Sequence, residues 1–300
     1  KPFDYSIKAM VWDNRTVVTK YENATRSLGT LKGYIQNGGS PSDFYEGMEL
    51  GEIWGYHTDG LFASDAEAAA YEVDQTFVNQ AIISAAGDER GLHGGDVKFL
   101  DLNGDGVVNQ GKNTVDDPGD RTIIGNNQPR YNYGLNLSFQ YFGFDFGIFF
   151  QGIGKMDWAP ATNNVLFYGP YARPYATLIP RDFHKMIWSE DNPDAYLPRP
   201  RGYVGLGSNR ELTVPSDRYL QDISYCRLKN VTFGYTVPKS LTDKIGMGPV
   251  RFYFSGENLH YWSPFKKHSK YIDPEMAKTN STNRIYPWQR SFMFGIDLTF

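Results

Sequence analysis

The last ten residues of the chain alternate between apolar and small or polar side chains. Because successive side chains of a β-strand point to opposite faces, the segment predicts a strand with one apolar face and one polar face. The apolar face carries Phe292, Phe294, Ile296, Leu298 and Phe300. Such a strand fits a wall that has lipid on one side and water on the other.

The same alternation is strongest in the middle of the chain, where it predicts a hairpin that turns at Phe142-Gly143. One face collects aromatic and aliphatic side chains: Tyr131, Tyr133, Leu135, Leu137, Phe139, Tyr141, Phe144, Phe146, Ile148 and Phe150. The other face collects the polar candidates for a water-filled lumen: Asn132, Asn136, Ser138, Gln140, Asp145 and Gln151. A soluble sheet would have to cover so aromatic a face, so the pattern favours contact with lipid over a buried sheet face.

Weaker patterns place the remaining elements. Strands are predicted over 3–11, 52–62 and 225–237, from 250 onward, and over 291–300, with extended structure over 16–21. One helical stretch is predicted over 66–86, which is rich in Ala and Glu and ends at Gly87. The segments 153–220 and 260–288 are predicted to be long loops, and 238–249 to be a compact turn.

The order of these elements predicts a consistent direction for each strand. If the chain end lies on the periplasmic side, the turns at 142–143 and 238–249 fall on that side and both long loops fall outside. Outer-membrane barrels have this asymmetry of short inner turns and long outer loops. On the same reasoning, Arg227 and Lys229 share the face of Val231 near the outer rim, where they contact lipid phosphates or water.

Composition narrows the class of protein. The formal charge is −4 without a long run of either sign, which argues against a nucleic-acid surface. The abundance of Tyr, Phe and Gly favours β-structure, and no apolar run reaches the ~18 residues of a membrane-spanning helix. The single cysteine, Cys226, precludes an internal disulfide, and a start at Lys1 predicts a mature chain or a piece of a longer one.

One motif predicts a metal site. The segment 101–109 matches the first nine positions of a calcium-binding loop, in which oxygen ligands surround one hard cation and a glycine permits the sharp turn. Lys112 stands where the closing Glu is expected, so Asp116, Asp117 or Asp120 would have to replace it. The alternative is an Asx- and Gly-rich turn that binds no metal. The candidate ligands are Asp101, Asn103, Asp105, the carbonyl of Val107, and Asn109.

No pattern predicts an enzyme. The segment 106–112 resembles a phosphate-binding loop, but Asn113 replaces the Ser or Thr and Pro118 prevents the long helix that would support a phosphate. The five histidines have no zinc-ligand spacing, and no Gly-x-Ser-x-Gly elbow is present. We therefore predict noncovalent binding without catalysis.

Six stretches together resemble the C-terminal part of the SusC/RagA-type TonB-dependent outer-membrane transporters of Bacteroidetes. They are Gly51-Glu-Ile-Trp-Gly-Tyr-His-Thr-Asp-Gly-Leu-Phe62, Gly95-Asp-Val-Lys-Phe-Leu-Asp-Leu-Asn-Gly-Asp-Gly106, Asp120-Arg-Thr-Ile-Ile-Gly125, Tyr225-Cys-Arg-Leu-Lys-Asn-Val-Thr-Phe-Gly-Tyr-Thr-Val-Pro-Lys239, Phe254-Ser-Gly-Glu-Asn-Leu259 and Gly295-Ile-Asp-Leu-Thr-Phe300. Their order covers nearly the whole chain.

The resemblance implies an all-β fold: residues 1–300 would form the C-terminal portion of a large antiparallel transmembrane barrel with long external loops. It implies a SusD-like surface lipoprotein as partner, energy from TonB, and a plug domain with no counterpart in this sequence. It also aligns Asp120 with the closing carboxylate of the calcium loop and makes 110–119 an insertion. Phe300 resembles the C-terminal signal of outer-membrane assembly.

The function so implied is nutrient import across the outer membrane, with oligosaccharides as the first choice of substrate and peptides as the second. Aromatic residues of the long loop are the candidates for substrate or partner contact: Trp158, Tyr168, Tyr171, Tyr175 and Trp188. A soluble calcium-stabilised β-sandwich that binds glycans is the alternative, and a non-transporting adhesin barrel is a third interpretation.

Overall fold

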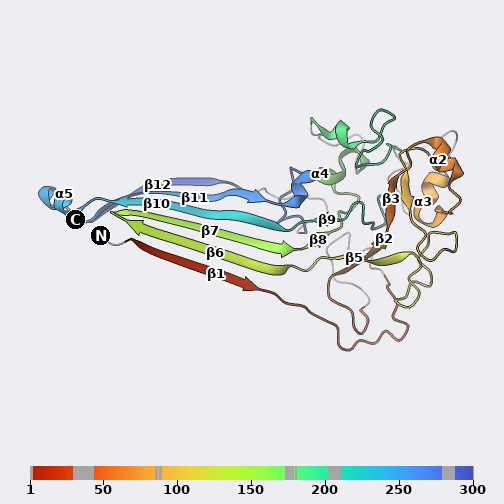
Figure 1. Ribbon diagram of the computed structural model, residues 1–300, viewed down its shortest axis with the longest axis horizontal. Coiled ribbons are helices and arrows are strands. Elements are labelled where there is room, and N and C mark those ends of the chain that lie inside the picture. Colours follow the sequence, from red (N-terminus) through yellow and green to blue (C-terminus); the bar gives the residue numbers. More distant parts are fainter. Residues whose placement is uncertain are drawn as a thin grey trace.

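The computed structural model describes residues 3–29, 44–84, 87, 90–172, 179, 181–201, 211–278 and 288–299. Its main feature is one long antiparallel sheet of six strands in the order β1-β6-β7-β10-β11-β12 (Figure 1). The strands are β1 (Asp4–Trp12), β6 (Arg130–Tyr141), β7 (Phe144–Lys155), β10 (Tyr225–Thr236), β11 (Val250–Trp262) and β12 (Ser291–Leu298). The predicted strands of the wall are confirmed, and β11 runs two residues past the predicted start of its loop at 260.

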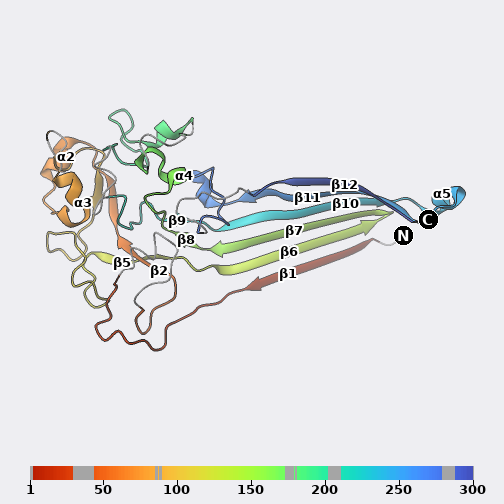
Figure 2. The same cartoon turned by 180° about the vertical axis from the view of Figure 1, so that it is seen from behind.

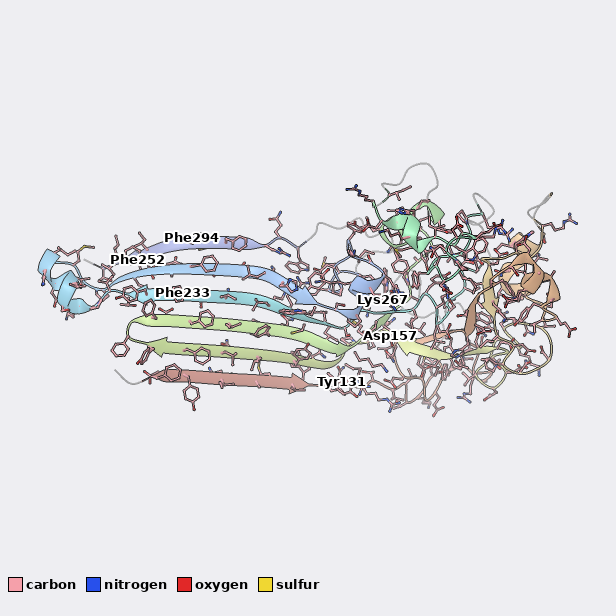
Figure 3. All side chains as sticks on the ribbon, turned by 45° about the horizontal axis from the view of Figure 1, so that its top comes forward. Tyr131, Asp157, Phe233, Phe252, Lys267 and Phe294 are labelled. Carbon is pink, nitrogen blue, oxygen red and sulfur yellow. The ribbon has the colours of Figure 1, made fainter. Side chains whose placement is uncertain are left out.

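The register keeps the two faces of this sheet distinct. Leu137 of β6 lies between Ile7 of β1 and Ile148 of β7, and Phe233 of β10 lies between Phe146 and Phe254. The residues that pair across the strands on this apolar face are uncharged. The aromatic side chains of the face lie along the sheet in Figure 3. Phe294 is 79% exposed, so the described residues leave this face largely uncovered.

Aromatic side chains mark both ends of the apolar face. Tyr141 and Phe144 lie beside the short turn, and the ring of Tyr235 lies 4.5 Å from that of Phe144. Tyr133 and Trp262 lie at the opposite end, on the same face. Tyr133 and Tyr141 are eight residues apart in β6, which is roughly 27 Å at ~3.4 Å per residue. At the ~35–45° tilt of outer-membrane barrel strands this length spans roughly 19–22 Å of height, close to the ~25 Å apolar band between the aromatic girdles of such barrels.

The short turns and the long connections lie at opposite ends of the sheet, as predicted (Figures 1 and 2). Phe142 and Gly143 both have positive φ, at 47° and 87°, which is the geometry of a two-residue hairpin turn with the twist of its strands. The other short turn contains α5 (Lys239–Thr242) and η5 (Asp243–Ile245). Both chain ends also lie at this end of the sheet, whereas the remaining short elements lie at the far end, which we call the loop domain.

The loop domain consists of short elements around two small apolar cores. Ile153 of β7 packs against the larger core, so the loop domain rests on the polar side of the sheet. None of the helices in the described residues has the length and apolar character needed to cross a membrane. The elements are β2 (Glu52–Tyr56), β3 (Thr58–Leu61), α2 (Asp65–Ala70), α3 (Thr76–Ile83), β4 (Val97–Phe99), β5 (Arg121–Asn126), β8 (Asp157–Trp158), α4 (Val165–Tyr168), η2 (Gly169–Tyr171), η3 (Phe183–Met186), β9 (Gln221–Asp222) and η6 (Pro264–Lys267).

Three sequence predictions are wrong in the loop domain. The strand over 52–62 is two strands, because the chain leaves β5 at Tyr56 and pairs with β4 from Thr58 onward. The helix over 66–86 is α2 and α3, because the segment between them bonds elsewhere: the Tyr71 hydroxyl donates to the Phe99 carbonyl at 2.7 Å. Within 16–21 only Val17 forms a β-bridge, to Glu49.

Candidate functional site

The polar face of the sheet is the first part of the candidate site. Register places Asn136 opposite Phe149, Ser138 opposite Gly147, and Gln140 opposite Asp145. Asn132 and Gln151 belong to the same face by alternation. The six predicted lumen residues therefore share one side of the sheet, opposite the apolar face. That this side lines a lumen stays a prediction.

An ion cluster crosses four strands on this polar face. The Arg251 guanidinium donates to both oxygens of Asp145, at 3.0 and 2.7 Å, and to Asp297 at 3.3 Å. Arg251 lies on β11 and Asp145 on β7, so the pair passes over β10 at Gly234. A Cβ on Gly234 would lie 2.5 Å from Asp145 and 2.7 Å from Arg251. Glycine is therefore needed here to leave room for the ion pair.

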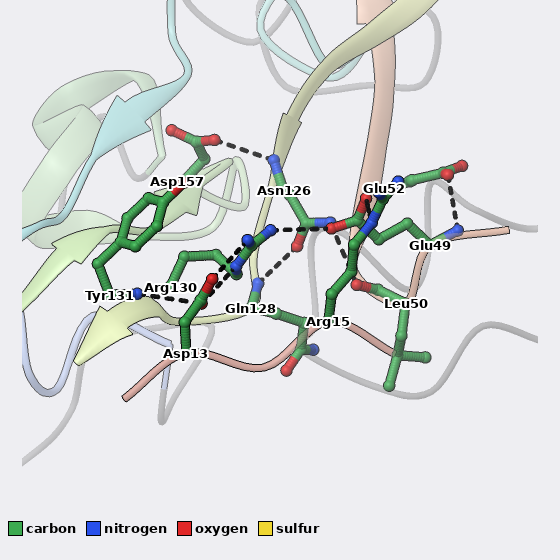
Figure 4. A network of polar contacts seen from close by, with 10 residues as sticks. All are labelled: Asp13, Arg15, Glu49, Leu50, Glu52, Asn126, Gln128, Arg130, Tyr131 and Asp157. Carbon is green, nitrogen blue, oxygen red and sulfur yellow. Dashed lines mark hydrogen bonds and ion pairs between the residues drawn. The ribbon is translucent and has the colours of Figure 1, made fainter. Parts of the chain in front are cut away.

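A second polar network joins the sheet to the loop domain (Figure 4). Arg130, at the start of β6, donates to both oxygens of Asp13 at 2.6 Å, and the Tyr131 amide donates to Asp13 at 3.2 Å. Glu49 lies 3.5 Å from Arg130 and 2.7 Å from Arg15. The network therefore fixes the end of β1 to the start of β6 and to the segment that precedes β2.

The Asp13 contacts predict a defined response to acid. The hydrogen bonds from Arg130 lower the pKa of Asp13 to about 2. Since the folded-state pKa is depressed, the stabilisation is complete above the ordinary value of 3.8 and is lost as pH falls toward 2. The unfolding midpoint of Asp13→Asn should therefore lie below that of the native protein by a constant amount from pH 8 to 5. The gap should close between pH 4 and 2, and a gap independent of pH would contradict the assignment.

The third part of the site is an ion cluster at the loop end, and it corrects a prediction. Leu228 pairs with Phe150 whereas Asn230 pairs with Phe149, so Lys229 is an extra residue in β10. This β-bulge reverses the alternation on its N-terminal side. Arg227 therefore lies opposite Gln151 on the polar face, and not on the lipid side near Val231.

Arg227 binds the loop that joins β11 to β12. Its side chain is 2% exposed, and its guanidinium lies 2.5 Å from Asp273 and 3.0 Å from Glu275. Lys229 lies 3.1 Å from Glu275, and its ammonium group lies 4.6 Å from the centre of the Trp288 ring. These contacts fold the loop back onto the polar face. Because Arg227 is buried against two carboxylates, it acts as a latch that holds the loop. It is therefore not available to contact a lipid phosphate.

The Asp-rich segment 101–109 forms a closed loop. The Asp101 carboxylate accepts hydrogen bonds from the amides of Gly104 and Gly106 at 2.7 and 2.8 Å, and these bonds lower its pKa. Asp120 is fully buried, and its carboxylate accepts the amides of Leu102 and Asn109 at 2.9 and 2.8 Å. The Asp120 amide also donates to the Asn109 carbonyl at 3.1 Å. The segment 110–119 therefore leaves the loop at Asn109 and comes back to it at Asp120.

The ligand types of this loop fit a hard cation, because they are carboxylate, amide and carbonyl oxygens. The side-chain oxygens of Asn103 and Asp105 accept the backbone amides of Asp105 and Val107, both at 2.9 Å, and Val107 forms a β-bridge to Asp74. In the part of the chain that the structure describes, no three His, Cys, Asp or Glu side chains are grouped closely enough to hold a metal ion. Calcium binding stays a prediction.

The predicted aromatic contacts lie mostly inside the loop domain. Trp158 and Tyr168 are 6% and 2% exposed and belong to its larger core, which leaves their rings no face for a ligand. Tyr171 packs on the same core and donates to the Pro198 carbonyl. Trp188 covers Gly95, where a Cβ would lie 2.3 Å from the indole ring. Tyr175 lies outside the described residues, as does Phe300, so their predicted roles stay predictions.

Comparison with known proteins gives sequence relatives. No protein-family model matches the chain. It is 30% identical over 266 residues to TonB-dependent receptor P3 of Formosa agariphila, covering 85% of this chain and 22% of the relative. It is 25% identical over 296 residues to TonB-dependent receptor SusC of Bacteroides thetaiotaomicron, covering 98% of this chain and 25% of SusC. The chain therefore spans about a quarter of the length of the curated relatives it matches.

Solved structures give the same fold. The structure of the RagAB peptide transporter superposes with a TM-score of 0.60 at 17% identity, covering 99% of this chain and 27% of that one. The RagAB peptide importer in its open-open state gives a TM-score of 0.57. The two-faced sheet, the loops gathered at one end and the named relatives agree. The chain is a SusC/RagA-like barrel segment of a TonB-dependent outer-membrane receptor.

Proposed function

We propose that the receptor containing this chain imports nutrients across the outer membrane. Oligosaccharides are the first choice of substrate class and peptides the second. The receptor binds its substrate noncovalently. The sheet supplies part of the barrel wall, and the loop domain supplies part of the external surface that first meets the substrate. A SusD-like surface lipoprotein captures ligand with it, and TonB provides the energy through the plug.

The separation of the two sheet faces carries this proposal. An apolar face free of charge, bounded by aromatic residues at both ends, is suited to the hydrocarbon of a bilayer. The opposite face holds the amides, hydroxyls and the Asp145–Arg251–Asp297 cluster, which require water or polar partners. A wall with these two faces separates lipid from an aqueous lumen.

The sheet edges indicate what completes the wall. Among the described residues β1 and β12 each pair with a strand on one side alone. An open edge within hydrocarbon would leave backbone amides and carbonyls without partners, at a cost of several kcal/mol for each group. We infer that strands outside this chain pair with both edges and close the barrel.

An uptake assay tests the proposed function. Cells that lack the receptor should lose uptake of its oligosaccharide, and cells that lack TonB should lose it equally. Uptake of a labelled oligosaccharide library by the native, receptor-deleted and TonB-deleted strains measures both effects. Uptake that continues without TonB would contradict the proposal. Uptake of peptides alone would move the substrate class to the second choice.

Extraction separates this proposal from the soluble glycan-binding sandwich. The receptor should enter the detergent phase and stay with outer membranes after a carbonate wash. Recovery in the aqueous phase without detergent would favour the sandwich. A receptor gene that encodes no plug would favour the adhesin barrel.

We also propose that the loop 101–109 binds calcium, with Asp101, Asn103 and Asp105 as side-chain ligands, Asp120 in support, and Val107 and Asn109 completing the set. Extracellular calcium sites have a Kd of about 10⁻⁴–10⁻³ M. At 10 mM calcium, ten- to a hundredfold above this Kd, binding adds about 1.4–2.7 kcal/mol of stability. The thermal midpoint of the loop domain should therefore rise on adding calcium and fall in EDTA.

Two variants sharpen the calcium test. Asp105→Asn should abolish the calcium-dependent rise. Asp116→Asn is the matched control, because Asp116 lies at the surface and pairs with Arg26 at 2.7 Å. It should keep the full rise. A midpoint that is the same with calcium and with EDTA would reject the metal site.

A further inference from the structure

The loop domain contains a cavity that none of the sequence motifs marks. It has a volume of about 320 Å³ and lies between α4, η3 and the residues that follow η6. Its apolar lining comes from Leu166, Phe167, Phe183 and Met186. Phe167 and Phe183 belong to the buried core of the loop domain, so this side of the cavity is fixed in place. The volume is at the lower end of the range for small-molecule sites.

The opposite part of the lining is cationic. Lys185, Lys267 and Lys270 line the cavity together with one acid, Asp182. Figure 3 shows Lys267 at the loop end of the sheet. Across the described ranges, none of these three lysines forms an ion pair.

Two other lysines of the loop domain and the adjoining end of the sheet are neutralised by carboxylates. Lys98 contacts Asp59 and Glu67 at 3.0 and 3.1 Å, and Lys229 contacts Glu275 at 3.1 Å. Among the described residues, three lysines without an ion pair and one carboxylate therefore give the lining an excess positive charge. That charge favours an anionic ligand.

The backbone on this side of the cavity is fixed. Ser269 lines the cavity and is 4% exposed, and within the described chain its Oγ has no hydrogen-bond partner. The neighbouring backbone is held in place, since the Ser269 amide donates to the Phe265 carbonyl at 3.0 Å. The Oγ atom itself has almost no accessible surface, so it faces the protein and not a ligand in the cavity.

The side chain of His268, the residue before Ser269, is also held in place. The His268 ring stacks on Tyr196 with 3.9 Å between centroids and 5° between planes. Its Nδ1 donates to the Gln221 side-chain oxygen at 3.2 Å. The cavity wall from His268 to Ser269 is therefore held from two directions before any ligand arrives. A site fixed in this way loses little freedom on binding.

We propose that this cavity binds the carboxylate-bearing unit of the imported ligand. The carboxylate lies among the three lysines, and the body of the unit lies against Leu166 and Met186. The inference rests on the proposed import function and adds the charge of the substrate to it. A uronic-acid unit of an oligosaccharide and the C-terminal residue of a peptide both supply this chemistry.

Calorimetry on the purified full-length receptor tests the proposal. The probes are a trigalacturonate against its neutral galactose counterpart, and a Leu-Leu dipeptide with a free against an amidated C-terminus. The carboxylate member of at least one pair should bind about tenfold tighter, the worth of one charge-assisted hydrogen bond. The pair that shows the difference identifies the source of the carboxylate.

Charge-removing variants locate the binding. Lys267→Gln with Lys270→Gln should weaken the carboxylate probe about tenfold and leave the neutral probe unchanged. Both side chains are exposed, so the variants should fold. Lys239→Gln with Lys244→Gln is the control, since it removes the same charge from the short turn at the other end of the sheet. It should leave both affinities unchanged.

Several outcomes would overturn the proposal. They are equal affinity for the acidic and neutral members of both pairs, no binding of either acid, and an effect of the lysine variants equal to that of the control. Loss of the partner lipoprotein with unchanged affinity for the acid would also overturn it, and would make the cavity a protein interface. Failure of the import function is seen separately, as uptake that does not need TonB.

Discussion

A lysine in place of Leu137 is expected to destabilise the receptor in a bilayer by about 2–4 kcal/mol. This is the cost of a cationic side chain at the midplane of the lipid face of a barrel. Leu137 lies near the middle of β6, between Ile7 and Ile148 on the apolar face. An ammonium group there would be placed in hydrocarbon without a partner. Urea titration of the full-length receptor folded into phospholipid vesicles measures the loss.

Ser138→Lys is the matched control, because the adjacent residue points to the opposite face. Ser138 lies between Ser6 and Gly147, so a lysine there has room and no charged side chain directly opposite. It should change the free energy of unfolding by no more than about 0.5 kcal/mol, as surface substitutions usually do. Equal losses for the two variants would contradict the assignment of the faces.

Replacing Arg227 with methionine should release the loop between β11 and β12. Removing one partner of a buried ion pair costs about 3–5 kcal/mol, because the remaining charges are left uncompensated. Asp273 and Glu275 would both lose Arg227, and Lys229 alone would remain beside Glu275. Hydrogen exchange of the peptide 263–278 should quicken by more than about 100-fold, since each 1.4 kcal/mol is tenfold.

Arg251→Met is the control for this variant. It removes an arginine from the same face of the sheet, but its partners are Asp145 and Asp297 near the short turns. It should leave the exchange of 263–278 unchanged. Adding Asp273→Asn and Glu275→Gln to Arg227→Met should restore most of the protection. Unchanged exchange in Arg227→Met alone would show that the latch does not hold the loop.

The sheet was predictable because its signal is local. Alternation of side chains from one residue to the next sets which face each occupies, and Phe142-Gly143 marks the hairpin turn between two long strands. The bulge at Lys229 was not predictable, since one inserted residue leaves no composition signal. Its consequence is large, because every assignment N-terminal to it in β10 changes face.

The loop domain was much less predictable. Aromatic residues such as Trp158 and Tyr168 have the same local pattern whether they build a core or bind a ligand, and the structure shows a core. The cavity draws its lining from residues about a hundred positions apart, such as Phe167 and Ser269. Only tertiary packing brings them together. The Asp-rich motif was recognisable because its spacing is local. The position of Asp120 beside it depends on the path of the segment 110–119.

The central claim is that one face of the sheet contacts lipid and the other contacts water. Spin labels placed singly at 133–140 of β6, in a receptor whose Cys226 is replaced by alanine, test it directly. Labels at odd positions should collide more with oxygen, which concentrates in hydrocarbon, and labels at even positions more with a water-soluble nickel complex. Odd positions shielded from both reagents would mean a face buried in protein and would contradict the account.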